Sequence, residues 1–552
     1  MRQESSGDIL IYTMTCGCQW PIIGPASREG GLPLLDVDIN HLPDCPLPWD
    51  MMSKGITKGV FQLESRLGSQ WSKRLRPRNN EHLSALGALL RPGCLMAKDE
   101  NGISMTEHYC RRVNKEESAD SFHPALDEIL GSTEQIMIYQ EQAMQIGAKI
   151  AGFDLKDVDR LRKAIGKKDQ REMGEVKKLF LEGATRQAVV PEKMAAEIWG
   201  WIEKSGRYSF NRSHSMSYGM TGYDTAYLKS HFPVQFYTSW LSYAEDKVKP
   251  DLEVMELVED ARRQGVLVLP PDVRQKEAVF HTDGVDIYFG IGNIKGLGGT
   301  GLVKMLSRIK EIEESLDKPL AQWCWYDWLL NIGSMSVSIS QRLAMAGALD
   351  WFGVKRQRML AELEVVSSMT DKELEYLAGQ SSDHNTTFSS ALKAMAKTKK
   401  EGGGCANAKR VSLVRGQADL LESPPTPLND NPAWMAWAEE QVFGFPLTCT
   451  RVDGCDLGDA NTTVGEFLAG KTGFLLLGVE IRSIRIIRTK KGTEMAFLSL
   501  ADSSGVLDDA TCFSEALEEY RHLLTQGNTV LVQGGRDKKR KSLLINKVFQ
   551  LA

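Results

Sequence analysis

The stretch over residues 209–230, SFNRSHSMSYGMTGYDTAYLKS, constrains the fold of this chain more than any other. Polar side chains open it, and tyrosines then recur at helical spacings. A buried helix would carry more Leu and Ile, whereas a fully solvated helix would carry fewer aromatic rings. Two interpretations remain open: a core helix whose hydroxyl groups are satisfied locally, and a helix with one face against a ligand.

Length and composition limit the class of protein. A chain of 552 residues is too long for one core, so we expect several domains. Its 42% hydrophobic and 25% charged residues are typical of a soluble globular protein. No apolar run reaches the roughly 18 residues of a membrane span, and the N-terminus lacks the layout of a signal peptide. We therefore expect a cytoplasmic protein with no membrane partner.

The charge distribution and the cysteine spacing indicate which ligands the chain can bind. The net charge of −5 argues against a protein that is basic throughout, but local basic runs lie at residues 73–78, 160–171 and 536–541. One such run is usually a solvated face, whereas three on one chain favour a polyanionic partner. The ten cysteines are scattered, and the tight pair Cys16 and Cys18 has no second pair at the spacing of zinc ligands. We therefore expect free thiols and no metal bound by this chain.

Three helices are predicted ahead of residue 209. The first covers residues 82–90 and stops at Arg91-Pro92-Gly93. A capping-box pattern, Ser132 followed by Gln135, predicts the start of the second. The third covers residues 157–168 and carries cations on one side, which fits either a triphosphate site or a solvated face. The apolar stripe of the second helix predicts a core face made of Ile136, Tyr139, Ala143, Ile146 and Ile150.

A glycine-rich turn follows in the second half of the chain. Residues 294–301, IKGLGGTG, come after a predicted strand over 285–291 and open a helix. The G-x-G-x-x-G pattern is also that of a dinucleotide site, but no second β-α-β unit follows it. A helix-hairpin-helix turn, whose backbone N–H groups contact a DNA phosphate without reading the sequence, fits better.

A short peptide after the polar spacer 379–410 has the form of a docking motif. Residues 416–421 read GQADLL and are followed by a Pro-rich tail. We expect an exposed loop here, in which the Gln and the paired leucines dock into a hydrophobic groove on a partner.

The C-terminal segment, residues 472–552, predicts a small five-stranded barrel of the OB type. Alternating runs lie at residues 474–479, 495–500, 529–532 and 543–548, with a helix near 515–524. Basic turns and exposed aromatics would give the barrel a groove for single-stranded DNA. The alternative is a barrel used only for protein interactions.

These stretches lie in the order and register of one known family. The matching motifs are GVFQLESR, LLRPG, IMIYQEQAMQI, RLRKAIGKK, FNRSHSMSYGMTGYDTAYLKSHFPVQFY, LPPDV, YFGIGNIKGLG, GQADLL, EEQVFGF and the final barrel. From about residue 34 onward the chain resembles the bacterial replicative DNA polymerase III alpha subunit, a C-family polymerase. The resemblance implies a multidomain, mainly α protein followed by a small all-β OB barrel.

The resemblance also implies a domain division. It places an irregular lead-in and a remnant of the palm–fingers junction at 1–59, fingers at 60–245, a clamp-binding domain at 246–430, a connector at 431–471 and the OB domain at 472–552. Within the clamp-binding domain, the helix-hairpin-helix covers 285–352 and the clamp peptide covers 417–421.

The same resemblance assigns site residues by group. The incoming nucleotide and the template would meet Arg162, Lys163, Lys167, Asn211, Arg212, His214 and Tyr218. The DNA backbone would meet Lys295, Gly296 and Gly298, and the sliding clamp would meet Gln417, Asp419, Leu420 and Leu421. Single-stranded DNA would meet Lys490, Lys491, Phe497 and Arg536 of the OB domain.

Some positions depart from the family pattern. Cys94 follows Arg91-Pro92-Gly93 where the family has Pro, and Arg212 stands where the family has Lys. The second change keeps the charge but alters the hydrogen-bonding geometry. The family's Ser-Gly-His-Pro is replaced by residues 446–449, PLTC.

Phosphoryl transfer needs carboxylates that hold two metal ions. The resemblance places these in the palm, upstream of GVFQLES, on stretches that this sequence does not show. Asp36 and Asp38 share one face of a strand but align with a non-catalytic segment. We therefore expect no catalytic residue here, and Mg²⁺ bound only by the assembled polymerase.

The resemblance implies the partners as well. They are primer-template DNA, dNTPs and a sliding clamp. Because the palm carboxylates are missing, our leading hypothesis adds a separate palm-bearing chain of a split, phage-encoded polymerase. The alternative is a non-catalytic DNA- and clamp-binding scaffold, or a protein that interferes with a host replisome.

Overall fold

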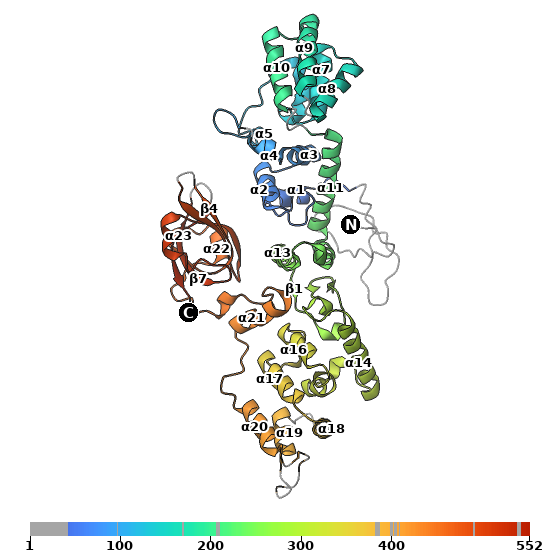
Figure 1. The fold of residues 1–552 in the computed structure, drawn as a ribbon, viewed down its shortest axis with the longest axis vertical. Coiled ribbons are helices and arrows are strands. Elements are labelled where there is room, and N and C mark those ends of the chain that lie inside the picture. The colour runs from blue at the N-terminus through green and yellow to red at the C-terminus, as the bar shows by residue number, and fades with distance from the viewer. Residues whose placement is uncertain are drawn as a thin grey trace. The chain divides into compact units, whose positions relative to one another are not determined.

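The computed structural model describes the chain from residue 42 to 551, apart from residues 97, 168–169, 206–209, 381–386, 398–400, 402–403, 405, 408, 490–491 and 538–541. Asp36, Asp38, Lys490 and Lys491 therefore lie outside the described residues. The chain divides into two compact units, Met1–Trp240 and Leu241–Ala552, which are described separately (Figure 1). Of the helices in the described part, none is long and apolar enough to span a membrane.

The first unit is helical and is built around the long helix α11 (Arg212–His231). Helices α1 (Pro46–Ser53) and α3 (Asn80–Leu89) pack directly on α11, and α12 (Pro233–Ser242) follows it. The neighbouring helices are α2 (Arg66–Leu75), α4 (Pro92–Met96) and α5 (Met105–Val113). Polar N-cap side chains fix several of these helix starts: Ser65 accepts from Gly68 N, Asn79 from His82 N and Ser104 from Glu107 N.

Small residues let α3 and α11 approach closely. A Cβ atom added at Gly219 would lie 3.1 Å from the backbone nitrogen of Ser84, and one at Gly222 would lie 3.4 Å from the carbonyl oxygen of Phe61. The Ser215 hydroxyl donates to the carbonyl of Ser84 over 2.6 Å. The spacing between α3 and α11 therefore depends on glycine at position 219, whereas Gly222 leaves room for the segment that precedes α2.

A separate helical lobe follows in the same unit. It contains α6 (Pro124–Leu130), α7 (Gln140–Ala151), α8 (Leu155–Lys167), α9 (Gln170–Gln187) and α10 (Glu192–Ser205). Its core joins Ile146, Leu161, Phe180 and Trp199, all fully buried.

The helix predicted to start at Ser132 is wrong in its boundary. Helix α7 begins at Gln140, because Gln135 has a φ of 60°, which a right-handed helix does not accept. The side chain of Gln142 instead caps the helix, since its Oε1 accepts from the backbone N–H groups of Ile138 and Tyr139, each over 2.9 Å. Ile136 and Tyr139 are buried as predicted, but from the segment that precedes the helix.

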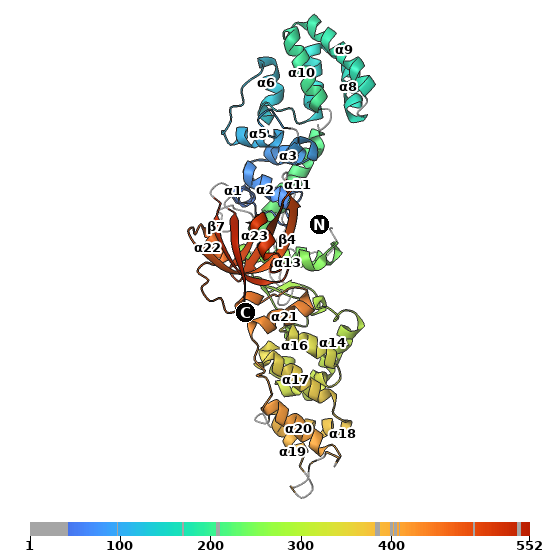
Figure 2. The ribbon, with the colours of Figure 1, turned by 60° about the vertical axis from the view of Figure 1, so that its left-hand side comes forward.

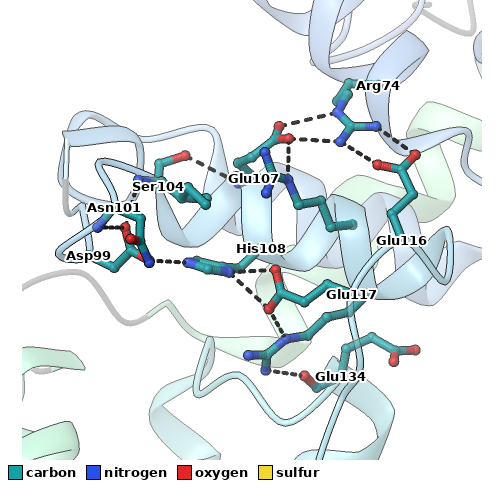
Figure 3. A network of polar contacts seen from close by, with 12 residues as sticks. Arg74, Asp99, Asn101, Ser104, Glu107, His108, Glu116, Glu117 and Glu134 are labelled. Atoms are coloured by element: carbon teal, nitrogen blue, oxygen red, sulfur yellow. Dashed lines mark hydrogen bonds and ion pairs between the residues drawn. The ribbon is translucent and has the colours of Figure 1, made fainter.

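A network of ion pairs ties α5 to its surroundings (Figure 3). Arg74 of α2 contacts Glu107 and Glu116, each at 2.7 Å, and Arg111 contacts Glu107 at 2.8 Å. In the second half of the network, Glu117 accepts from Arg112 Nε and lies 2.8 Å from the ring of His108. The network joins α2, α5 and the segment after α5.

Lowering the pH should destabilise the first unit through these carboxylates. Burial raises the pKa of Glu107, but Arg74 and Arg111 lower it more, so its pKa lies below the ordinary value. Burial likewise raises the pKa of Glu117, and Arg112 and His108 overcome that effect. A carboxyl group with a lowered pKa contributes stability above its unfolded pKa of about 4.3, and this is lost as the pH falls through its folded value. We expect the thermal unfolding midpoint, followed by circular dichroism, to fall below about pH 4.3.

Arg74→Met provides the control for this expectation. The variant removes the guanidinium that lowers the pKa of Glu107 and Glu116. Its unfolding midpoint should therefore decline less steeply with acid than that of the unaltered chain. An equal decline in both proteins would show that other groups cause the acid sensitivity.

The second unit begins with helices and a small sheet. Strands β1 (Val268–Leu269), β3 (Ile287–Tyr288) and β2 (His281–Thr282) lie in that order in the sheet. The strand predicted over 285–291 corresponds to β3 and is shorter than expected. The longer helices of this part are α13 (Pro250–Arg263), α14 (Thr300–Leu316), α16 (Val337–Met345), α17 (Arg356–Ser367), α18 (Asp371–Gln380), α19 (Phe388–Met395), α20 (Val411–Glu422) and α21 (Pro432–Phe443). The short helices α15 (Trp325–Trp328) and α22 (Val464–Ala469) belong to the same unit.

The C-terminal part is a closed five-stranded barrel, as predicted (Figure 2). Its strands are β4 (Leu475–Arg488), β5 (Glu494–Asp502), β6 (Gly505–Cys512), β7 (Thr529–Arg536) and β8 (Leu543–Gln550). They lie in the order β4-β5-β6-β8-β7, with β6 and β8 parallel and the other pairs antiparallel. Helix α23 (Ser514–Tyr520) connects β6 to β7 and is shorter than the predicted 515–524. A mainly helical protein with a small barrel is therefore confirmed.

Candidate functional site

Helix α11 answers the question that its sequence left open, because its two halves have different surroundings. In the C-terminal half, Tyr223, Tyr227 and Lys229 are buried. Lys229 Nζ donates to the carbonyl of Lys58 over 2.7 Å, and Thr225 Oγ1 accepts from Phe61 N over 3.0 Å. In the N-terminal half, Tyr218 is 39% exposed. The helix is thus a core helix at one end and presents a surface at the other.

Asn211 starts α11 as its N-cap residue. Its Oδ1 accepts from the backbone N–H of His214, and its Nδ2 donates to Glu141 Oε1, both over 2.9 Å. The other oxygen of Glu141 accepts from the backbone N–H of Arg212 over 3.0 Å. A carboxylate of α7 therefore already lies at the positive end of the α11 dipole.

Arg212 is also paired. Its guanidinium lies 3.0 Å from Glu81 Oε1 and 5.8 Å from the centre of the Tyr139 ring. The side chain remains 40% exposed. A phosphate bound by Arg212 would therefore compete with Glu81.

His214 and Tyr218 belong to a row of rings along the exposed side of α11. The centroid of His214 lies 5.2 Å from that of Phe210 and 4.1 Å from that of Tyr218, and the Tyr218 ring lies 5.1 Å from Phe61. At one end, the guanidinium carbon of Arg91 lies 3.7 Å from the centre of the Phe210 ring. We call these five residues the aromatic row.

The aromatic row borders a cavity of about 250 Å³, which all five of its members line. Between them the wall consists of small residues of α3 and α11, including Gly87, Ser215 and Gly219. Sequence reasoning missed Phe61 and Arg91 as members of this site. The motif GVFQLESR contains Phe61 and the motif LLRPG contains Arg91. Neither motif indicates that its segment packs beside α11 in the fold.

The cations predicted on α8 that the structure describes are paired with carboxylates of α8 or of α9. Asp159 lies 2.8 Å from both Arg162 NH2 and Lys163 Nζ. Arg160 contacts Glu172 and Glu175 of α9. The side chain of Lys167 is outside the description. Among the described residues, no recorded polar contact joins the α8 cations to Asn211, Arg212 or His214.

The predicted DNA-backbone residues lie in the segment that precedes α14. Lys295 Nζ contacts Asp251 Oδ2 at 2.6 Å, so its charge is partnered. Gly296 has a φ of 77°, and a Cβ atom there would lie 2.8 Å from the guanidinium carbon of Arg342. A Cβ atom at Gly298 would meet nothing within 4 Å, so the turn is open at this residue. The three residues thus lie in one short segment, but only at Gly298 is the space around the Cβ position open.

The exposed loop predicted at residues 417–421 is wrong. These residues form the C-terminal part of helix α20, in which Val414, Ala418 and Leu421 are buried at helical spacing. Leu420 is 58% exposed, whereas Leu421 is 3% exposed. The apolar repeat produces a helix that packs on its neighbours, which the short motif alone did not indicate.

In the barrel, the predicted single-strand residues are divided. Phe497 lies partly buried on β5, with the guanidinium carbon of Arg485 5.5 Å from its ring centre. Arg536 instead donates to the carbonyl of Phe467 and lies 4.1 Å from the Phe467 ring centre, so it is bound to α22. The neighbouring strand β6 exposes Asp508 and Asp509 near Ser499, two residues along β5 from Phe497, and Ser499 Oγ donates to Asp508 Oδ1 over 2.9 Å.

The side chains that could hold a metal ion do not gather in the described part of the chain. Over the described part of the chain, His, Cys, Asp and Glu side chains form no group of three or more that is arranged to hold a metal ion. The described residues therefore do not fit the pair of Mg²⁺ ions of a polymerase.

Comparison with known proteins shows what the chain is similar to. The model of the bacterial DNA polymerase III alpha subunit finger domain matches residues 33–188. The DNA polymerase III alpha subunit of Deinococcus radiodurans is 32% identical over 90% of this chain. The chain is similar to a part of the bacterial DNA polymerase III alpha subunit.

Other relatives agree with this assignment. The alpha subunits of Thermus aquaticus and Aquifex aeolicus are 32% and 29% identical over 90% and 91% of the chain. The chain spans 35% of the Deinococcus subunit and 38% of each of the other two. It therefore corresponds to part of an alpha subunit, and α11 lies outside the segment matched by the finger-domain model.

Proposed function

We propose that this chain is the nucleotide-gating, DNA-holding and clamp-tethering part of a replicative DNA polymerase. The observation that carries the proposal is the relationship to DNA polymerase III alpha subunits over nine tenths of the chain. The aromatic row and the N-terminus of α11 are the surface proposed to meet the incoming dNTP and the template. In this proposal the fingers cover 60–245, the clamp-binding domain 246–430 and the connector 431–471.

The proposed assignments for the second unit draw on topology. The barrel order β4-β5-β6-β8-β7, with a helix between the third and fourth strands, favours an OB domain. OB barrels bind single strands through the second and third strands, which here are β5 and β6. Phe497 offers a ring for base stacking, while Asp508 and Asp509 weaken the attraction for a phosphate chain.

The catalytic carboxylates come, in this proposal, from a separate palm-bearing chain. The support is the lack of a fitting donor group among the described residues. Within the assembled enzyme, Mg²⁺ would neutralise charge on the transferred phosphoryl group. The residues of this chain would bind and orient the nucleotide, with His214 and Tyr218 beside the base and Arg212 exchanging Glu81 for a phosphate.

Primer extension tests the proposal. With Mg²⁺ and dNTPs, this chain alone should bind primed DNA but extend no primer, and addition of a palm-bearing chain from the same genome should produce extension. Extension by this chain alone would overturn the split arrangement. Failure of the combined chains to extend, with DNA bound, would favour a non-catalytic scaffold.

A matched pair of variants tests the surface assigned to the nucleotide. Tyr218→Ala removes a ring that is 39% exposed in the aromatic row, whereas Tyr243→Ala removes an exposed ring elsewhere on the chain. Loss of one stacked base contact is worth about 1–3 kcal/mol, or about five- to 150-fold in affinity. Only Tyr218→Ala should raise the KM for dNTPs in the combined enzyme.

A further inference from the structure

We propose that α20 holds the clamp-binding segment in a closed state, and that the sliding clamp binds it only after α20 has left its helical neighbours. The inference rests on the proposed clamp-tethering function and adds a conformational step to it. Its basis is the difference between the docking segment that the motif requires and the helix that residues 417–421 form.

The segment cannot present both of its leucines while it remains in place. Adjacent residues in a helix point about 100° apart, and here Leu421 is 3% exposed while Leu420 is 58% exposed. A hydrophobic groove that takes both side chains therefore requires Leu421 to leave the core. Gln417 is engaged as well, since its Nε2 donates to Ser368 Oγ over 2.9 Å.

Several contacts hold α20 closed, and they come from three helices. The side chain of Arg358 on α17 donates to the carbonyl of Leu421. On α19, Lys393 Nζ lies 3.6 Å from Asp419 and also contacts Glu422. Glu373 of α18 forms an ion pair at 2.9 Å with Arg410, which directly precedes α20. Figure 1 shows α20 beside α19 in this part of the second unit.

Val414, a buried residue outside the docking segment 417–421, also contributes to the closed state of α20. Val414 lies one turn before Ala418 on the buried face of α20 and is fully buried. The helix therefore uses residues on both sides of position 416 to remain closed.

One glycine makes the inference testable without altering the docking segment. Gly416 lies inside α20, and a Cβ atom there would meet nothing within 4 Å. Alanine is the better helix former at such an exposed position. Gly416→Ala should therefore stabilise the closed state, whereas Val414→Ala should weaken it by removing buried methyl groups.

Clamp binding by the full chain should respond in opposite directions to these two variants. Apparent affinity falls with the fraction of molecules in the competent open state. With a purified bacterial sliding clamp as the probe, Gly416→Ala should weaken binding about fivefold, given the helix propensity difference. Val414→Ala should tighten binding by at least a similar factor.

A peptide of residues 411–424 is the control that distinguishes failure of this inference from failure of the proposed clamp-tethering function. An isolated peptide of this length forms little helix in water, so it has no closed state to leave. The unaltered, Gly416→Ala and Val414→Ala peptides should bind the clamp equally, and more tightly than the full chain. A peptide that does not bind would overturn the proposed clamp-tethering function itself.

Hydrogen exchange provides the second readout on the full chain. The amide protons of α20 should become less protected when the clamp is saturating, because the helix has to leave α17 and α19. If the peptide binds but the chain binds as tightly, with α20 still protected and both variants unchanged, the closed state is refuted and clamp tethering stands.

Discussion

Arg356→Met should lower the free energy of unfolding of the second unit by about 3–5 kcal/mol, the cost of leaving a buried charge without its partner. The Arg356 side chain is 3% exposed and lies 3.1 Å from Glu439, whose side chain is completely buried. Glu439 also accepts from the backbone N–H groups of Leu447 and Thr448, over 2.7 and 2.8 Å. Without Arg356, this carboxylate of α21 would be left in the core without its cationic partner. Urea unfolding of the full chain, followed by tryptophan fluorescence, measures the loss.

The control removes the charge that the first substitution leaves behind. In Arg356→Met combined with Glu439→Gln, position 439 keeps an oxygen that accepts hydrogen bonds but carries no charge. The double variant should be more stable than Arg356→Met alone, because the buried unpaired charge is the main cost. If the double variant loses as much stability as the two single losses added together, the ion pair is not the source of the effect.

Sequence patterns predicted elements well where a regular repeat had one dominant interpretation. The alternating runs of the C-terminal segment predicted the barrel, and the glycine-rich turn at 294–301 predicted the start of the helix that follows it, α14. The closed strand order and the parallel pairing of β6 with β8 were not predictable from these runs, because they depend on contacts between residues far apart in the chain.

The candidate site was harder to predict from the sequence, because a charged residue in a sequence does not show which residue it pairs with in the fold. Arg212 was predicted to meet a nucleotide, but the sequence does not show that Glu81, 131 residues earlier, lies beside it. The docking motif was misread because only five residues were considered. They matched a loop motif, but Val414, Ala418 and Leu421 together form the buried stripe of a helix. The longer pattern determined the local structure.

Gly219→Val should separate α3 from α11 and disturb both stability and nucleotide binding. A Cβ atom at this position would lie 3.1 Å from the backbone nitrogen and 3.4 Å from the Cα of Ser84, and valine adds two further methyl groups toward α3. Because these neighbours are backbone atoms, they cannot rotate away as a side chain would. Overpacking of this kind costs about 1–3 kcal/mol. The unfolding midpoint of the first unit should fall accordingly.

The same substitution should weaken the proposed nucleotide surface, because Tyr218 and His214 precede Gly219 on α11 and the Ser215 hydroxyl bonds to Ser84. The matched control is Gly87→Ala, which faces the same cavity from α3. A Cβ atom there would meet only the Ser215 hydroxyl, at 3.9 Å, so the added methyl fits and favours the helix. Gly87→Ala should leave stability equal or higher and the KM for dNTPs unchanged in the combined enzyme, whereas Gly219→Val should raise that KM. Equal effects of the two substitutions would show that the close approach of α3 and α11 does not position the aromatic row.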